Sequence, residues 1–137
     1  MDDILAIQIL KARYFRGIDT KDWDLLTSVM VEDVAIDVTD DVEGGEPYVG
    51  REKFVRTCAK VLATATTVHH GHMPEIQVDG TTATGIWAME DFVDWGEVDG
   101  KRQAFRGFGH YHEQYAKADG EWRITRLTLT RIRRDWL

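Results

Sequence analysis

The stretch that decides the fold, residues 79–120, reads DGTTATGIWAMEDFVDWGEVDGKRQAFRGFGHYHEQYAKADG. The dipeptide Asp-Gly stands at 79–80, 99–100 and 119–120. Asp-Gly between apolar segments is the strongest short-range sign of an antiparallel hairpin, because both residues tolerate the positive φ of the turn. The flanking segments are rich in β-branched and aromatic residues with an alternating pattern. We therefore predict four strands in a meander, at 76–78, 82–95, 103–115 and 122–132.

The sequence before His69 has the spacing of helices. Apolar residues follow a helical period in residues 3–18, and Asp2 and Asp3 can cap its first turn. Shorter helices are predicted at 22–30, where Asp22 is a capping residue, and at 51–64, while DDVEGGEP at 40–47 is typical of a loop. Helices followed by a strand meander favour an α+β fold, with a curved antiparallel sheet folded over the helices around an apolar pocket.

Composition favours a single globular domain over 1–137, since the 137 residues are 43% hydrophobic and 30% charged, with no repeat or linker. The net charge of −7 disfavours nucleic acid and anionic membranes as partners, and the basic run Arg131–Arg134 is too short to change this. Cys58 is the single cysteine, so it cannot form an internal disulfide. We expect a cytoplasmic protein, because the sequence has neither a signal-peptide pattern nor a long apolar span.

Four local signatures in this chain resemble one known family. They are Tyr-x4-Asp at 14–19, His-x-Gly-His-x-Pro-Glu-Ile at 69–76, Thr-Ala-Thr-Gly-x-Trp-x3-Asp at 82–91, and Arg-Ile at 131–132. Together, over nearly the whole chain, they resemble the SnoaL-like, NTF2-like superfamily, and within it dehydratases of the bile-acid 7α-dehydratase and scytalone-dehydratase type. Carried over position by position, the catalytic residues of those dehydratases match Tyr14, Asp19, His69, Asp91 and Arg131.

The resemblance implies an NTF2-like cone and a reaction. The expected activity is the elimination of water from a hydrophobic cyclic hydroxy-carbonyl compound, such as a steroid, a polyketide or an aromatic intermediate, without metal or organic cofactor. The same fold also hosts isomerases, cyclases, small-molecule-binding modules and oxygenase small subunits, and these stay open as alternatives. The resemblance further implies a homodimer or homotrimer.

His69 is the best candidate base, because the ordinary pKa of histidine, about 6.5, is close to neutral pH. Asp19, just past Gly17 at the end of the first helix, could accept a hydrogen bond from the imidazole and fix its tautomer. The alternatives are a solvated strand-edge histidine and an ordinary turn aspartate. Tyr14 lies on the apolar stripe of its helix, where its hydroxyl could stabilise an enolate oxygen or be packed in the core.

Strand alternation predicts that Asp91 faces inward. Burial would make Asp91 a proton donor unless Arg131 pairs with it, and a bulge could turn it outward. Arg131 has the inward parity of the leucines before it, so it could pair with Asp91, stabilise an oxyanion, or lie on the surface with its neighbouring arginines. The residues expected to contact substrate are Trp87, Met89, Trp95 and His110, with His112 on the same strand face as His110.

A metal site at His69, His70 and His72 is disfavoured, because adjacent strand residues point to opposite faces. Two departures from the dehydratase pattern bear on the substrate. Only six residues follow Arg131, which predicts a more open pocket, and the acidic loop 40–46 has no obvious counterpart. Loops at a pocket mouth usually set substrate choice, so we expect a substrate unlike a bile acid.

Overall fold

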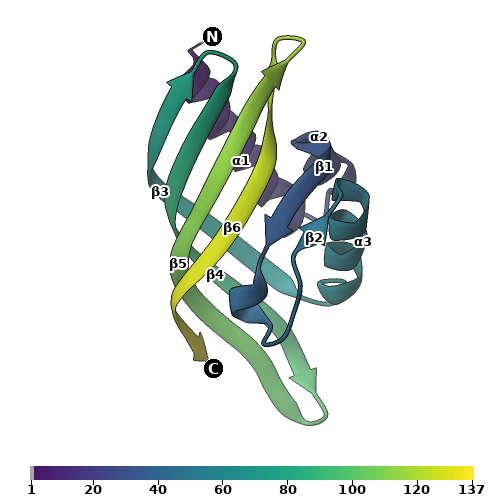
Figure 1. The fold of residues 1–137 in the computed structure, drawn as a ribbon. Helices are drawn as coiled ribbons and strands as arrows, with labels where there is room; N and C mark the ends of the chain where they lie inside the picture. Colours follow the sequence, from purple (N-terminus) through teal and green to yellow (C-terminus); the bar gives the residue numbers. More distant parts are fainter. Residues whose placement is uncertain (1) are drawn as a thin grey trace.

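The computed structural model describes residues 2–137, which form helices on one face of a curved sheet (Figure 1). The helices are α1 (Asp3–Asp19), α2 (Trp23–Ser28), α3 (Arg51–Val61) and the short 3-10 helix η1 (Thr39–Asp41). The strands are β1 (Met30–Asp37), β2 (Tyr48–Val49), β3 (Thr66–Asp79), β4 (Thr82–Val98), β5 (Lys101–Ala118) and β6 (Glu121–Trp136). The predicted α+β class is confirmed.

The sheet has the order β2-β1-β6-β5-β4-β3. Consecutive strands from β3 to β6 pair antiparallel, as do β1 and β2, whereas β1 runs parallel to β6. The predicted Asp-Gly hairpins are present. At two of the turns the Asp and the Gly both have positive φ, Asp99 at 54° with Gly100 at 79° and Asp119 at 53° with Gly120 at 79°. These are the values a type I′ turn needs, and its twist matches that of the long strands on either side.

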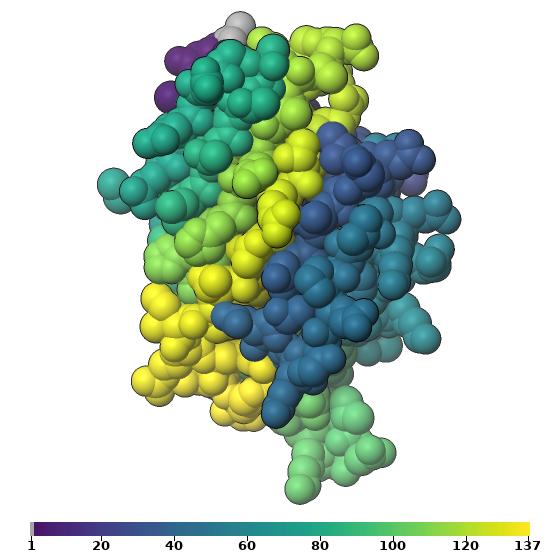
Figure 2. All heavy atoms as spheres, in the orientation of Figure 1, coloured from purple at the N-terminus to yellow at the C-terminus, as the bar shows by residue number. Residues whose placement is uncertain are grey.

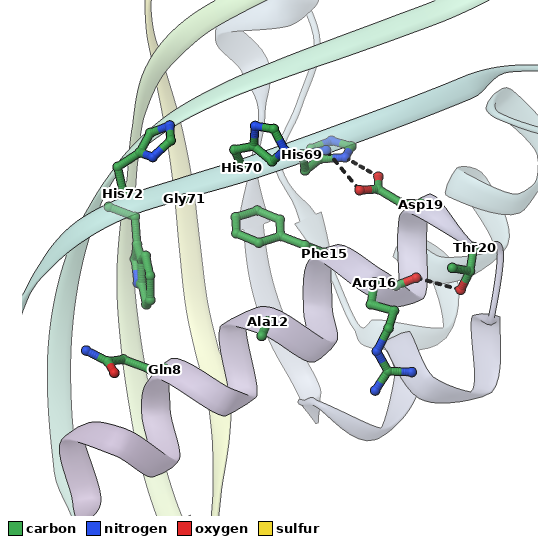
Figure 3. A pocket seen from close by; sticks show the side chains of 11 residues that line it. Gln8, Ala12, Phe15, Arg16, Asp19, Thr20, His69, His70, Gly71 and His72 are labelled. Atoms are coloured by element: carbon green, nitrogen blue, oxygen red, sulfur yellow. Dashed lines mark hydrogen bonds and ion pairs between the residues drawn. The ribbon is translucent and has the colours of Figure 1, made fainter.

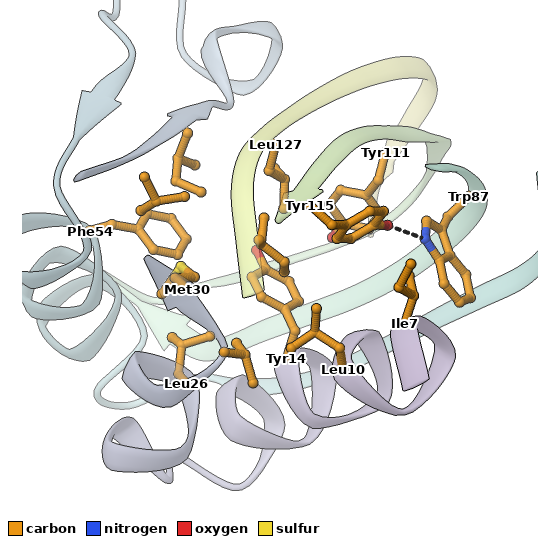
Figure 4. Packing of buried hydrophobic residues seen from close by; sticks show 14 of the residues in the cluster. Ile7, Leu10, Tyr14, Leu26, Met30, Phe54, Trp87, Tyr111, Tyr115 and Leu127 are labelled. Atoms are coloured by element: carbon orange, nitrogen blue, oxygen red, sulfur yellow. Dashed lines mark hydrogen bonds between the residues drawn. The ribbon is translucent and has the colours of Figure 1, made fainter. Parts of the chain in front are cut away.

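Of the predicted capping residues, Asp2 and Asp22 cap their helices, whereas Asp3 is the first residue of α1. Asp2 Oδ1 accepts from the N–H of Ile4, and Asp22 Oδ1 accepts from the N–H of Leu25. Helix α1 buries the stripe that includes Tyr14 and Ile18 against the sheet. Figure 4 shows this packing, with α1 below and the aromatic side chains of β4 and β5 above it. The core therefore lies between the helices and the concave face of the sheet.

Several predicted boundaries differ from the structure, since β4, β5 and β6 also extend beyond their predicted ranges, and the two strands at one side of the sheet, β1 and β2, were not predicted. Helix α2 ends at Ser28 rather than at residue 30, because Met30 already begins β1, a strand that was not predicted. Helix α3 ends at Val61 rather than at residue 64. Strand β3 covers 66–79 instead of 76–78, with a bulge between His72 and Glu75. Within residues 2–137, no helix is both long and apolar enough to cross a membrane.

Candidate functional site

His69 is held by the last residue of α1. Its backbone N–H donates to Asp19 Oδ2 at 2.9 Å, and its ring Nδ1 lies 2.6 Å from Asp19 Oδ1. The Thr67 hydroxyl also donates to Oδ1 at 2.9 Å. Because both Asp19 oxygens already accept, from the Thr67 hydroxyl and the His69 N–H, the carboxylate acts as the acceptor toward the ring as well, so in the neutral imidazole Nδ1 carries the proton and Nε2 keeps its lone pair. The predicted contact between Asp19 and the imidazole is therefore present, and its tautomer is the one a base requires.

His69 lies in the wall between two hollows. One is an open groove of about 810 Å³ between α1 and the edge strand β3. Figure 3 looks into this groove, with His69 and Asp19 at one end. The Phe15 ring, on α1, stacks on the imidazole with 6.0 Å between ring centroids and 14° between planes. The other hollow is a cavity of about 390 Å³ under the concave face of the sheet, a size suited to a small organic molecule.

Asp91 lies in this cavity, directly across the strand pair from His69. The register of β4 with β5 is unbroken from Thr82 to Asp94, so no bulge turns Asp91 outward. Its side chain is 5% exposed. On the next strand the opposite residue is Gly107, where an added Cβ would clash with Asp91 Oδ1 and Arg131 Nη1. The glycine therefore makes room for an ion pair.

Arg131 uses every donor of its guanidinium inside the protein. It pairs with Asp91 through Nη1 (2.7 Å) and Nη2 (2.9 Å), and with Asp41 through Nε (2.7 Å) and Nη2 (3.1 Å). The remaining Nη1 proton points to Met89 Sδ at 3.8 Å. Burial lowers the pKa of Arg131, but the two carboxylates outweigh burial and the net shift is upward. This geometry favours the paired role of Arg131 over the role of an oxyanion donor.

Asp40 and Asp41 belong to the acidic loop of residues 40–46. Besides the contacts of Asp41 with the guanidinium, Asp40 Oδ2 accepts from the backbone N–H of Arg131 at 2.9 Å. Figure 2 shows the loop lying against the C-terminal strand β6. Downstream of Arg131 the strand continues, and Arg134 and Trp136 line the cavity. The residues after Arg131 therefore form part of the cavity wall.

Replacing Arg131 by methionine should leave the Asp91 and Asp41 carboxylates without their shared cation. Removing one partner of a buried ion pair costs about 3–5 kcal/mol, so we expect a loss of this size in the free energy of unfolding. Urea denaturation followed by circular dichroism measures it. Arg133→Met is the matched control, because the Arg133 side chain on the same strand is 71% exposed. Equal small losses in both variants would contradict the structural role of Arg131.

Two tyrosines offer free hydroxyls to the cavity. Tyr14 on α1 and Tyr111 on β5 both line it, with 6.2 Å between ring centroids. Among residues 2–137, every fully buried side-chain nitrogen or oxygen has a hydrogen-bond partner. The hydroxyls of Tyr14 and Tyr111 have no hydrogen-bond partner among these residues, so they are not fully buried. We infer that they face the cavity that both rings line. Burial raises the pKa of both phenols well above 10, which keeps them protonated donors at neutral pH.

Of the four residues predicted to contact substrate, only Trp95 lines the cavity. Trp87 lines the open groove and donates to the Tyr115 hydroxyl. Met89 is buried beneath Arg131. The placement of His110 in the pocket is wrong: Tyr111 faces inward, so His110 and His112 point to the outer face of the sheet. Strand alternation permits only one of the two faces to reach the cavity.

The three histidines of β3 do not form a metal site in this structure. His69 is half-buried on the inner side of β3, whereas the exposed His70 and His72 lie on the other side and border only the open groove. In the part of the chain that the structure describes, no three His, Cys, Asp or Glu side chains converge as metal ligands do.

Cys58 lines the cavity, but burial raises the pKa of its thiol to about 12. The thiolate that a nucleophile needs is therefore scarce at neutral pH.

Sequence reasoning missed Asp41, Tyr111 and the buried pair Lys11–Glu113. Tyr111 is directly opposite Trp87 in the sheet, and Glu113 shares its face, but only strand pairing reveals this. Lys11 lies three residues before Tyr14, on the same helical stripe. A lysine on the apolar stripe of a helix indicates a buried charge with a partner, because lysine is almost never fully buried unless it is paired.

Comparison with known proteins supports the fold. Residues 1–128 match the model of the SnoaL-like domain. The protein Kfla4162 from Kribbella flavida superposes with a TM-score of 0.88 at 20% identity, over 97% of this chain and 93% of that one. A candidate scytalone dehydratase from Novosphingobium aromaticivorans gives 0.82 at 20% identity, over 97% and 86%. The hexachlorocyclohexane dehydrochlorinase LinA-type3 from Novosphingobium barchaimii gives 0.82 at 22% identity, over 98% and 90%.

Proposed function

Because this chain belongs to the SnoaL-like domain family, we propose that it is a lyase that removes water from a hydrophobic cyclic hydroxy-carbonyl compound with its own side chains alone. Elimination is the reaction class that the names dehydratase and dehydrochlorinase denote for two of its structural neighbours. The observation that carries the proposal is one oriented base in the wall of an apolar cavity. His69 has Nδ1 bound to Asp19 and Nε2 free, directly across from Asp91.

The first step of the proposed reaction breaks a C–H bond next to a carbonyl. His69 Nε2 takes the proton, and Asp19 stabilises the imidazolium that forms. The electron pair moves toward the carbonyl oxygen, which accepts hydrogen bonds from the hydroxyls of Tyr14 and Tyr111. Donors already in place where charge develops are the largest source of rate enhancement in many enzymes.

The second step breaks the C–O bond. The electron pair returns from the oxygen to form the C=C bond, and the hydroxyl leaves as water with the proton from the His69 imidazolium. The ring is then neutral again. Asp91, positioned by the bidentate contact with Arg131, accepts a hydrogen bond from the substrate hydroxyl and orients it. In this scheme Arg131 acts through Asp91 and does not touch the substrate.

The test is the mass of the product. The purified protein is incubated with fused-ring β-hydroxy ketones of the steroid, polyketide and aromatic classes, and products are analysed by mass spectrometry. We expect a product lighter by one water from at least one class, absent with His69→Ala. A product of unchanged mass would replace the lyase by an isomerase or cyclase. Tight binding without turnover across the panel would replace it by a binding module.

A further inference from the structure

A lysine lies in the core beneath the two tyrosine rings. Lys11 Nζ is 3.8 Å from the ring centroid of Tyr14 and 3.7 Å from that of Tyr111. Its side chain is 0% exposed, and so is that of Glu113, whose Oε2 lies 2.6 Å from Nζ. The other Glu113 oxygen accepts from the Tyr115 hydroxyl at 2.6 Å. A buried ion pair therefore supports the inner side of the cavity floor.

Two residue spacings, one on α1 and one on β5, bring these four side chains together. Lys11 and Tyr14 are three residues apart on α1, so they are neighbours on one helix face. Tyr111 and Glu113 are two residues apart on β5, so they share one sheet face. Packing of α1 on β5 places the ammonium between the two rings and the carboxylate.

Stability alone does not account for this pair. Replacing a buried ion pair with apolar residues of similar volume is often neutral or stabilising, because desolvation of the two charges offsets their attraction. Burial lowers the pKa of Lys11 to about 8 even though Glu113 raises it, so the ammonium is still mostly charged at pH 7. An ammonium on a ring face interacts with the ring's negative quadrupole and withdraws electron density from it. A phenol with less electron density is a stronger hydrogen-bond donor. Burial above all, and to a smaller extent the Glu113 carboxylate, raise the pKa of both phenols and so act the other way, but the charge that lies directly on both ring faces is the ammonium.

We propose that Lys11 is a positioning and specificity-determining residue, which strengthens the Tyr14 and Tyr111 hydroxyls as donors so that the cavity prefers a ligand oxygen bearing negative charge. The ligand class is an enolate or phenolate on a compact apolar ring. This inference rests on the proposed function in one respect, since the enolate is the species that the proposed dehydration would form in the cavity. The preference itself is a binding property and needs no turnover.

The experiment compares two ligands of nearly equal shape at pH 7 by fluorine NMR titration. Pentafluorophenol is ionised at this pH, whereas hexafluorobenzene has fluorine in place of the oxygen and is neutral. Lys11→Met combined with Glu113→Gln removes both buried charges together. In this variant we expect the preference for the phenolate to fall roughly tenfold, while the affinity for hexafluorobenzene stays the same.

Lys117→Met is the matched control, because Lys117 also joins β5 to α1, through Asp3, but is 35% exposed and does not line the cavity. It should leave both affinities unchanged. Tyr14→Phe with Tyr111→Phe should remove the same preference, and adding the Lys11 and Glu113 changes should then have no further effect. An unchanged phenolate preference in the Lys11 variant, or an equal loss for both ligands, would overturn the proposal.

A second measurement covers a variant that fails to fold. In wild-type protein with 13C-labelled lysine, the assigned Lys11 Cε signal should shift on addition of pentafluorophenolate and stay in place with hexafluorobenzene. No shift with the phenolate would overturn the proposal. Failure of the proposed function is recognised separately, since water loss from the ketone panel would then be absent while the phenolate preference persisted.

Discussion

Replacing His69 by alanine should lower turnover of the true substrate by a factor of ~10²–10⁴, the usual contribution of general acid–base catalysis. The variant loses the imidazole Nε2, the nitrogen that His69 leaves free of Asp19 in the cavity wall across from Asp91. It keeps the tyrosine hydroxyls and the apolar walls, so substrate should still bind. Steady-state kinetics should therefore show a large fall in kcat and a small change in KM.

His70→Ala is the matched control for this variant. His70 is the next residue along β3, but its side chain lies on the outer face, 3.7 Å from Glu90. It should turn over substrate at the wild-type rate. Thermal denaturation of both variants distinguishes lost chemistry from lost folding. If His69→Ala retained near-normal turnover, the base would have to be sought elsewhere.

Local signals accounted for the parts of the fold that were predicted from the sequence. Asp-Gly turns and capping aspartates act over a few residues, so their pattern is readable. Strand β1 was missed because its partner β6 lies about ninety residues later in the chain, and because Glu32 and Asp33 interrupt its apolar alternation. Tertiary pairing, rather than local preference, makes these residues a strand.

Local patterns predicted some residues of the candidate site, and only tertiary pairing places the others. The placement of Asp91 and of Arg131 on the inner face followed from the alternation of side chains along the strand that carries each of them. The error about His110 came from choosing the wrong face of β5, which only the pairing of Tyr111 with Trp87 decides. Asp41 was out of reach because no local pattern tells which strand an acidic loop contacts. The catalytic roles of all five site residues and the homo-oligomer stay predictions.

Asp19→Asn should be nearly as damaging as the loss of His69, and the reason lies in the hydrogen bonds of the carboxylate. Both Asp19 oxygens accept, Oδ2 from the backbone N–H of His69 and Oδ1 from Thr67 and the imidazole. An asparagine must put its NH₂ group in one of these two places. Facing the backbone N–H it would oppose a donor that cannot rotate away, so it should turn toward the imidazole.

In that orientation the amide donates to Nδ1 and moves the ring proton to Nε2, so the base has no lone pair to offer the substrate. An asparagine that imposes the wrong tautomer can cost as much as ~10⁴-fold in kcat while the fold stays intact. Asp24→Asn, an exposed change in α2, is the control and should be silent. Because Asp19 acts through His69, the double variant should lose little more than the worse single variant. Losses that multiply would mean that the two residues act independently, and the proposed dyad would be wrong.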